Sequence, residues 1–165
     1  MRIGDWAAIG AATLLLASCK GEAPAPEPSQ AAAPADAAPG ITLSDARVQL
    51  PVVSGRPGAA YFTLSQANGA PRKLVGVAVE MAGRAEMHET AGDAMKPVSQ
   101  IALQAGKAVQ FAPGGYHVML FDLDPKLRFA KEVRITALLD DGAKAYATAP
   151  VTTVAESMEH MEGMH

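Results

Sequence analysis

The 165-residue chain contains one cysteine, and this scarcity excludes several kinds of metal and redox site. A disulfide framework, a CxxC redox pair and a zinc cluster of thiolates each need at least two cysteines. Positive charge is also short, with 14 Lys and Arg against 17 Asp and Glu and a net charge of −3. Binding to nucleic acid needs a basic face that contacts phosphates. The sequence therefore predicts no nucleic-acid partner.

Motifs for nucleotide binding and hydrolysis are absent as well. The sequence has no GxGxxG, no Walker loop and no GxSxG, so the usual glycine-rich phosphate loops and the nucleophile elbow are missing. No activated nucleophile or acid/base pair is visible either. We therefore expect a protein that is not an enzyme. Hydrophobic residues make up 49% of the chain, which is enough for the core of one ordinary domain.

The N-terminal apolar run, residues 7–17, is too short to span a bilayer as a stable helix. It follows Arg2 and ends in Leu16-Ala17-Ser18-Cys19, which resembles the lipobox of bacterial lipoproteins. We interpret residues 1–19 as a lipoprotein-type signal peptide, with Cys19 as the lipidation site. Lipid chains on Cys19 would anchor the protein to a membrane. The alternative is an ordinary signal peptide in which this cysteine occurs by chance.

Residues 20–40 are dominated by Ala and Pro with scattered acids. Repeated proline favours extended backbone and cannot form a packed core, so this segment is predicted to be a semi-rigid linker. It would hold a following domain, residues 41–155, away from the membrane.

The central segment contains short apolar runs between turn residues and no stretch with a convincing helical period. Turn signals include Asn68-Gly69, the run 113–115 and Asp141-Gly142. The predicted strands are Val48–Val53, Ala60–Ser65, Lys73–Glu80, Ala85–Glu89, Met95–Gln100, Ala108–Phe111, Tyr116–Phe121, Glu132–Asp140 and Ala143–Pro150. Strands at this spacing predict an all-β fold, a single-domain antiparallel β-sandwich.

All four histidines have a methionine within two positions. The groups are His88 with Met87, His117 with Met119, His160 with Met158 and Met161, and His165 with Met164. Thioether sulfur is a soft, uncharged donor and imidazole is intermediate, so the combination favours Cu(I) over Zn, Mg or Ca. A methionine or a histidine alone is more often structural. The repeated association is what indicates a copper site.

Strand alternation selects among these side chains. Residues i and i+2 of a strand share a face, so His117 and Met119 can contact one ion together. Met87 and His88 must face opposite ways, and we assign His88 to the site and Met87 to the core. Met95 opens the next predicted strand, across a hairpin from His88.

These residues also resemble a known family, the periplasmic copper chaperones called PCu(A)C. Its pattern is a His, then a Met, then 21 residues, then His-x-Met, and here 21 residues separate Met95 from His117-Val118-Met119. The similar strings are GAAYF (58–62), MHET (87–90), MKPV (95–98) and PGGYHVML (113–120). The resemblance covers about residues 41–150. The interval between His88 and Met95, residues 89–94, is shorter than is usual in the family, which makes Met95 the least secure of the ligands.

The resemblance implies a cupredoxin-like Greek-key β-sandwich that binds one Cu(I) through His88, Met95, His117 and Met119. It also implies a periplasmic copper chaperone that delivers copper to the dinuclear copper centre of cytochrome c oxidase. Together with the lipobox-like sequence at Cys19, this predicts a periplasmic, membrane-anchored lipoprotein. The partner would be the copper-accepting oxidase subunit.

Three alternatives remain. Copper sequestration without a specific acceptor would use the same ligands. A blue-copper electron carrier would need a cysteine thiolate beside its histidines, and Cys19 lies outside the domain. A metal-free β-sandwich interaction module would have no copper affinity.

The C-terminal segment, residues 156–165, is predicted to be a flexible tail because it lacks a core-forming pattern. Its candidate ligands are Met158, His160, Met161, Met164 and His165. We expect a second copper site there, and its imidazole and carboxylate groups would also suit Cu(II). The alternative is a solvated end with no role in metal handling.

Overall fold

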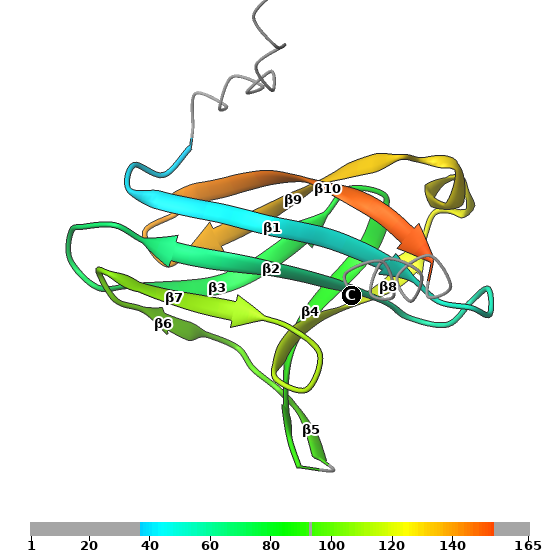
Figure 1. Cartoon of the computed structure of the whole chain (residues 1–165), viewed down its shortest axis with the longest axis horizontal. Coiled ribbons are helices and arrows are strands. Elements are labelled where there is room, and N and C mark those ends of the chain that lie inside the picture. The colour runs from blue at the N-terminus through cyan, green and yellow to red at the C-terminus, as the bar shows by residue number, and fades with distance from the viewer. Residues whose placement is uncertain (1–36, 93, 154–165) are drawn as a thin grey trace, which may run out of the picture. The chain divides into compact units, whose positions relative to one another are not determined.

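The computed structural model describes residues 37–92 and 94–153 (Figure 1). In this part of the chain there are ten strands, one short 3-10 helix and no α-helix. The elements are β1 (Ile41–Leu50), β2 (Gly58–Gln66), β3 (Arg72–Val79), β4 (Ala82–Ala91), β5 (Ala94–Pro97), β6 (Ile101–Leu103), β7 (Lys107–Phe111), β8 (Tyr116–Leu123), η1 (Pro125–Phe129), β9 (Glu132–Leu139) and β10 (Lys144–Thr153). The predicted all-β class is confirmed.

The strand prediction was wrong at three places. β1 begins at Ile41 and ends at Leu50, whereas Val52 and Val53 lie exposed in the following loop. β1 contains a bulge between Ser44 and Arg47, where Asp45 has a φ of 51°, so its hydrophobic alternation is broken. The strand predicted over residues 95–100 ends early, because β5 stops at Pro97, and β6, which was not predicted, begins at Ile101. Residues 125–129 form η1, which starts with a proline and was not predicted.

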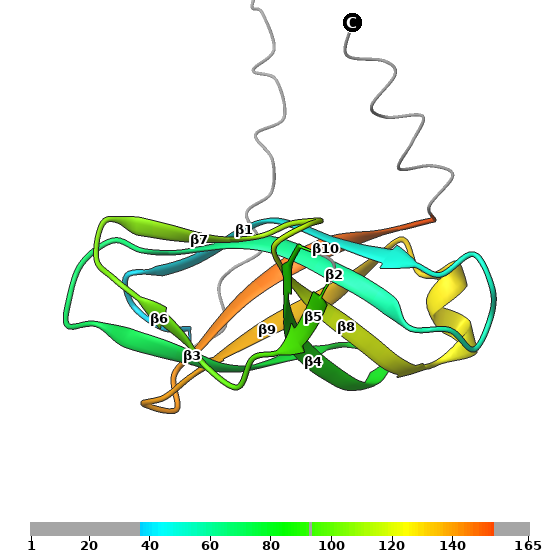
Figure 2. The same ribbon diagram turned by 90° about the horizontal axis from the view of Figure 1, so that it is seen from below.

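The strands are hydrogen-bonded in the order β5-β4-β8-β7-β2-β1-β10-β9-β3-β6. β10 connects two layers, because residues 144–150 pair with β9 and residues 151–153 pair with β1 (Figures 1 and 2). The β1–β10 pairing is parallel, and so is the single β7–β8 pairing. The expectation of a purely antiparallel sandwich is therefore wrong at these two contacts. The sequence pattern shows where the apolar runs lie, but it does not show which distant strands become neighbours. It therefore cannot reveal whether two paired strands are parallel or antiparallel.

β7 and β8 run one after the other along β2. Residues 62–65 of β2 pair with β7, and residues 58–60 pair with β8, in both cases antiparallel. The loop at residues 112–115 interrupts this line, and it contains Gly114 at a φ of 83°, a conformation that favours glycine. The loop thereby fixes where β8 begins.

Side chains from both layers form one hydrophobic core. β2 alternates buried and half-buried residues along its whole length, and the Phe62 and Phe111 rings stack with centroids 4.3 Å apart. Met87 is 6% exposed and belongs to this core. Its neighbour His88 must then face the opposite side of β4, as the alternation predicted.

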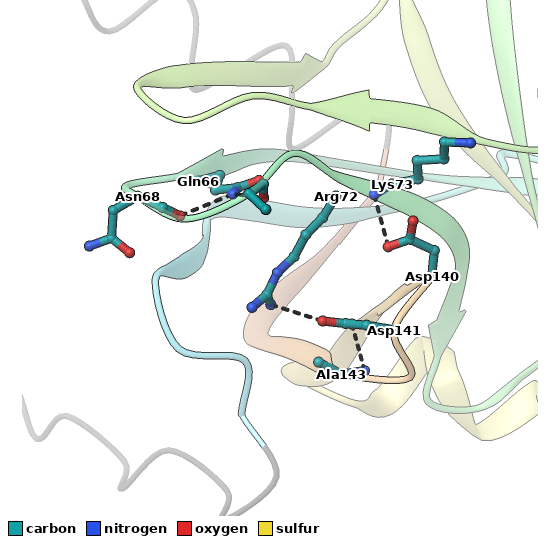
Figure 3. Close-up of polar contacts among 8 residues, drawn as sticks. Gln66, Asn68, Arg72, Lys73, Asp140, Asp141 and Ala143 are labelled. Atoms are coloured by element: carbon teal, nitrogen blue, oxygen red, sulfur yellow. Dashed lines mark hydrogen bonds and ion pairs between the residues drawn. The ribbon is translucent and has the colours of Figure 1, made fainter.

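Polar contacts stabilise and join the β2–β3 and β9–β10 turns (Figure 3). The buried Gln66 amide donates hydrogen bonds to the carbonyl oxygens of Asn68 and Ala70, at 3.0 and 2.6 Å. Arg72 forms an ion pair with Asp141 at 3.4 Å, so the β2–β3 connection is linked to the β9–β10 turn.

The domain contacts begin before Ile41. Ala38, within the predicted linker, is 5% exposed, and its N–H donates to the Lys144 carbonyl at 2.6 Å. The predicted signal peptide, most of the predicted linker and the predicted tail lie outside the described residues. Among the residues that are described, no helix has the length and apolar character needed to cross a membrane.

Candidate metal centre

His88 and His117 lie directly opposite each other on β4 and β8. Their imidazole centroids are 5.9 Å apart and the ring planes differ by 24°. The rings are stacked, and a nitrogen lone pair lies in the plane of its ring. An ion bound by both histidines would therefore lie at the edges of the two rings and not between their faces.

The orientation of His117 is fixed by the loop that precedes β8. The His117 Nδ1 atom is 3.0 Å from the Gly115 carbonyl oxygen, which also accepts a hydrogen bond from the Thr90 N–H at 3.1 Å. A carbonyl can only accept, so Nδ1 carries the proton and Nε2 keeps its lone pair. Such an outer hydrogen bond is the usual partner of a metal-binding histidine. The His117 side chain, 7% exposed, is thus held ready to bind through Nε2.

His88 has an unpaired ring nitrogen. Its Nδ1 atom is buried and has no hydrogen-bond partner within the described structure, whereas Nε2 lies 3.4 Å from Glu86 Oε2. Buried polar atoms nearly always have partners, so an exception needs an explanation. A lone pair that is left for a metal ion provides one.

Met119 shares the outer face of β8 with His117. Val118 and Leu120, which flank it, are fully buried in the core, so the alternation turns Met119 away from the core. Met119 is half-buried and pairs with Glu86 across β4. The sequence-based placement of His117 and Met119 on one face agrees with this geometry.

Met95 is brought to the same face by the β4–β5 hairpin, which projects from the rest of the sheet in Figure 1. It pairs with Thr90, which lies two residues after His88 on the same face of β4. A diagonal neighbour of this kind is about 7–8 Å away, which a methionine side chain can bridge. The short interval from His88 is accommodated by a turn at Gly92, which has a φ of 62°. Met95 is 54% exposed, unlike the other three candidates.

Two charged residues on this face were missed by the sequence analysis. Glu86 lies beside His88, and Arg84 forms an ion pair with Glu86. The Arg84 guanidinium carbon also lies 4.2 Å from the centroid of the Phe121 ring. The spacing of two residues from Arg84 to Glu86 to His88 was the available signal, because it places all three on one face of a strand.

The nearby donors are therefore mainly soft and neutral. Across residues 37–92 and 94–153, no three side chains drawn from His, Cys, Asp and Glu gather as a metal-binding group. Met119 and Met95 supply thioethers on the face of the histidine pair. Two imidazoles with thioethers form a donor set that fits Cu(I).

The comparison with protein families agrees with this architecture. The family described as "Putative lipoprotein LpqE-like" matches residues 41–151. The chain belongs to this LpqE-like family. A curated relative, "Putative lipoprotein Lxx21020" of Leifsonia xyli subsp. xyli, is 26% identical over 82% of this chain and 84% of its own length. The uncharacterized protein RP573 of Rickettsia prowazekii is 32% identical over 56% of this chain and 54% of its own length.

Solved structures resemble this LpqE-like chain throughout its β-domain. The solution structure of CuI-DR1885 from Deinococcus radiodurans is 32% identical, with a TM-score of 0.55 over 72% of this chain and 81% of that one. Apo-DR1885 is 28% identical, with a TM-score of 0.56 over 90% and 99% of the two chains. The copper-bound PCuAC domain from PmoF2 has a TM-score of 0.58 at 20% identity, covering 69% of this chain and 93% of that domain. The resemblance to the PCu(A)C family, and the fold it implied, are confirmed.

Proposed function

We propose that this LpqE-like protein is a copper chaperone that binds one Cu(I) ion through His88, Met95, His117 and Met119. The observation that carries the proposal is the His88–His117 pair: His88 Nδ1 has no partner among the described residues, and His117, with its proton on Nδ1, keeps the Nε2 lone pair. Cu(I) suits this donor set because thioether and imidazole are uncharged and soft to intermediate ligands. The similarity to CuI-DR1885 at 32% identity supports the same metal.

The test is a competition titration of the full chain against a Cu(I) chelator. We expect tight Cu(I) binding, and much weaker Zn(II) binding because the primary donors include no anion. His117→Ala should remove one tightly bound Cu(I) ion per chain. Met87→Leu is the matched control, because Met87 adjoins His88 but faces the core. The proposal is wrong if the chelator keeps all the copper, or if His117→Ala binds as tightly as the wild type.

We further propose that the protein hands its copper to the dinuclear centre of cytochrome c oxidase from a periplasmic position at the membrane. The anchor would be lipid on Cys19, an assignment supported by the lipobox-like sequence and by the lipoprotein description of the family. The oxidase as acceptor rests on the PCu(A)C resemblance. Mixing the Cu(I)-loaded protein with an apo oxidase copper domain should produce copper transfer. Retention of copper by the loaded protein would favour sequestration instead.

The predicted tail is proposed as a second copper site, formed by residues 158, 160, 161, 164 and 165. The register links Thr152 to Gln49, Gln49 to Ala59, and Ala59 to Met119. The end of β10 is thus three strand spacings, or about 14 Å, from Met119. The six residues from Thr152 to Met158 can span up to about 20 Å, so the tail is long enough to contact the first site.

Truncation after Ala155 tests this second site. The full chain should bind more copper per molecule than the truncated chain, and the excess should include Cu(II). An unchanged copper count and an unchanged transfer rate would show that residues 156–165 have no part in metal handling.

A further inference from the structure

We propose that Glu86 and Arg84 are positioning residues that set which nitrogen of His88 binds the metal and which metals the site accepts. In this arrangement one carboxylate oxygen of Glu86 holds the His88 Nε2–H, and the other is engaged by Arg84. His88 then presents Nδ1 to the ion, while Glu86 is withheld from it. The part of the inference that concerns metal selectivity rests on the proposed Cu(I) function, and the part that concerns the His88 tautomer does not.

The three groups are aligned by strand register. His88 pairs with His117, Glu86 with Met119, and Arg84 with Phe121, in successive positions on one face of β4 and β8. The carboxylate of Glu86 therefore lies within the candidate metal centre. An unrestrained carboxylate there would add an anionic oxygen ligand, which favours harder ions than Cu(I).

Both oxygens of Glu86 have partners. Oε1 forms the ion pair with Arg84, and Oε2 lies 3.4 Å from His88 Nε2. Arg84 is itself held on the Phe121 ring, with 4.2 Å from its guanidinium carbon to the ring centroid. A cation over an aromatic face is attracted by the ring. Phe121 thus places Arg84, and Arg84 draws Glu86 away from the ion.

The contact with Glu86 also determines the tautomer of His88. A carboxylate accepts a hydrogen bond, so the proton of neutral His88 belongs on Nε2. The lone pair is then on Nδ1, which is the buried nitrogen without a partner. His117 has the opposite arrangement, because the Gly115 carbonyl holds the proton on Nδ1. The two histidines would therefore bind one ion through different nitrogens.

The tautomers can be measured in the metal-free full chain by long-range ¹H–¹⁵N NMR, at mildly alkaline pH where histidine side chains are generally neutral. We expect the Nε2–H form for His88 and the Nδ1–H form for His117. Glu86→Ala should leave His88 as a mixture of tautomers and lower Cu(I) affinity about 10- to 100-fold, the usual effect of losing an outer-shell partner. Glu89→Ala is the matched control, since Glu89 lies on β4 but faces away from this side.

Metal selectivity tests the role of Arg84. Arg84→Leu keeps an apolar side chain on Phe121 but removes the charge and adds no donor atom, so Glu86 becomes free to bind the ion. Zn(II) affinity should then rise at least about tenfold relative to Cu(I) affinity. The double variant Arg84→Leu/Glu86→Ala should lose this gain. Preserved amide spectra verify that each variant is folded.

The proposal is overturned if wild-type His88 carries its proton on Nδ1, if Glu86→Ala leaves the tautomer unchanged, or if Arg84→Leu leaves the Zn(II)-to-Cu(I) ratio unchanged. The tautomer experiment contains no metal. If the wild type failed to bind Cu(I), the proposed function would be wrong, but the measured tautomers of His88 and His117 would still test the role of Glu86.

Discussion

Met95 and Met119 offer the same thioether from different surroundings, so replacing each with leucine measures what prior ordering contributes to copper binding. Met95 is 54% exposed on β5, a strand whose four residues are all exposed. Met119 is half-buried between two core residues of β8. Leucine has a similar volume and no sulfur, so each substitution removes a proposed ligand with little change in packing.

The expected difference follows from side-chain entropy. Fixing a freely rotating methionine costs up to about 1.5–2 kcal/mol. Met95 bears most of that cost when the metal binds, whereas folding has already restricted Met119. A net advantage of about 1.4 kcal/mol corresponds to a factor of ten in affinity. Met119→Leu should therefore weaken Cu(I) binding about tenfold more than Met95→Leu does.

The assay is a competition titration of each variant against one Cu(I) chelator at several concentrations. Met87→Leu serves as the control, because it removes a thioether next to His88 from the core side and should leave the affinity unchanged. Denaturant midpoints confirm that each variant is folded. Equal losses for the two variants, or a larger loss for Met95→Leu, would refute the reasoning from exposure.

Three further predictions concern the scaffold and the anchor. Leu120→Ala should lower the free energy of unfolding by about 2–5 kcal/mol, because Leu120 is 0% exposed. Urea unfolding measures this change. A value near zero would show that neighbouring side chains under β8 move in to fill the cavity. Gly114→Ala should cost about 1–2 kcal/mol, since Gly114 has a φ of 83°, and thermal unfolding would report it. Cys19→Ala should move the protein from the membrane fraction to the soluble fraction of cells, and continued membrane association would contradict lipidation.

Several features followed from local sequence pattern alone. Alternation along a strand has a period of two whatever the strand pairs with. That is why Met87 could be assigned to the core and His88 to the opposite face, and why His117 and Met119 could be placed together. The turn residues at 113–115 likewise marked the start of β8 correctly. The spacing of Met95 to His117 was enough to indicate the PCu(A)C resemblance.

Other features depended on contacts between segments that are distant in the chain. No local pattern states which residue of β4 faces His117, because strand register is set by the packing of the whole sheet. The same packing put Glu86 opposite Met119 and Arg84 opposite Phe121, so the charged neighbours of the site appeared only in the structure. β10 divides its pairing between β9 and β1 for the same reason. The sequence by itself determined which residue types could bind the metal and which face each strand would offer, since both are properties of one short segment. The tertiary structure decided which of those faces meet, since that depends on how the buried side chains of ten strands fit together.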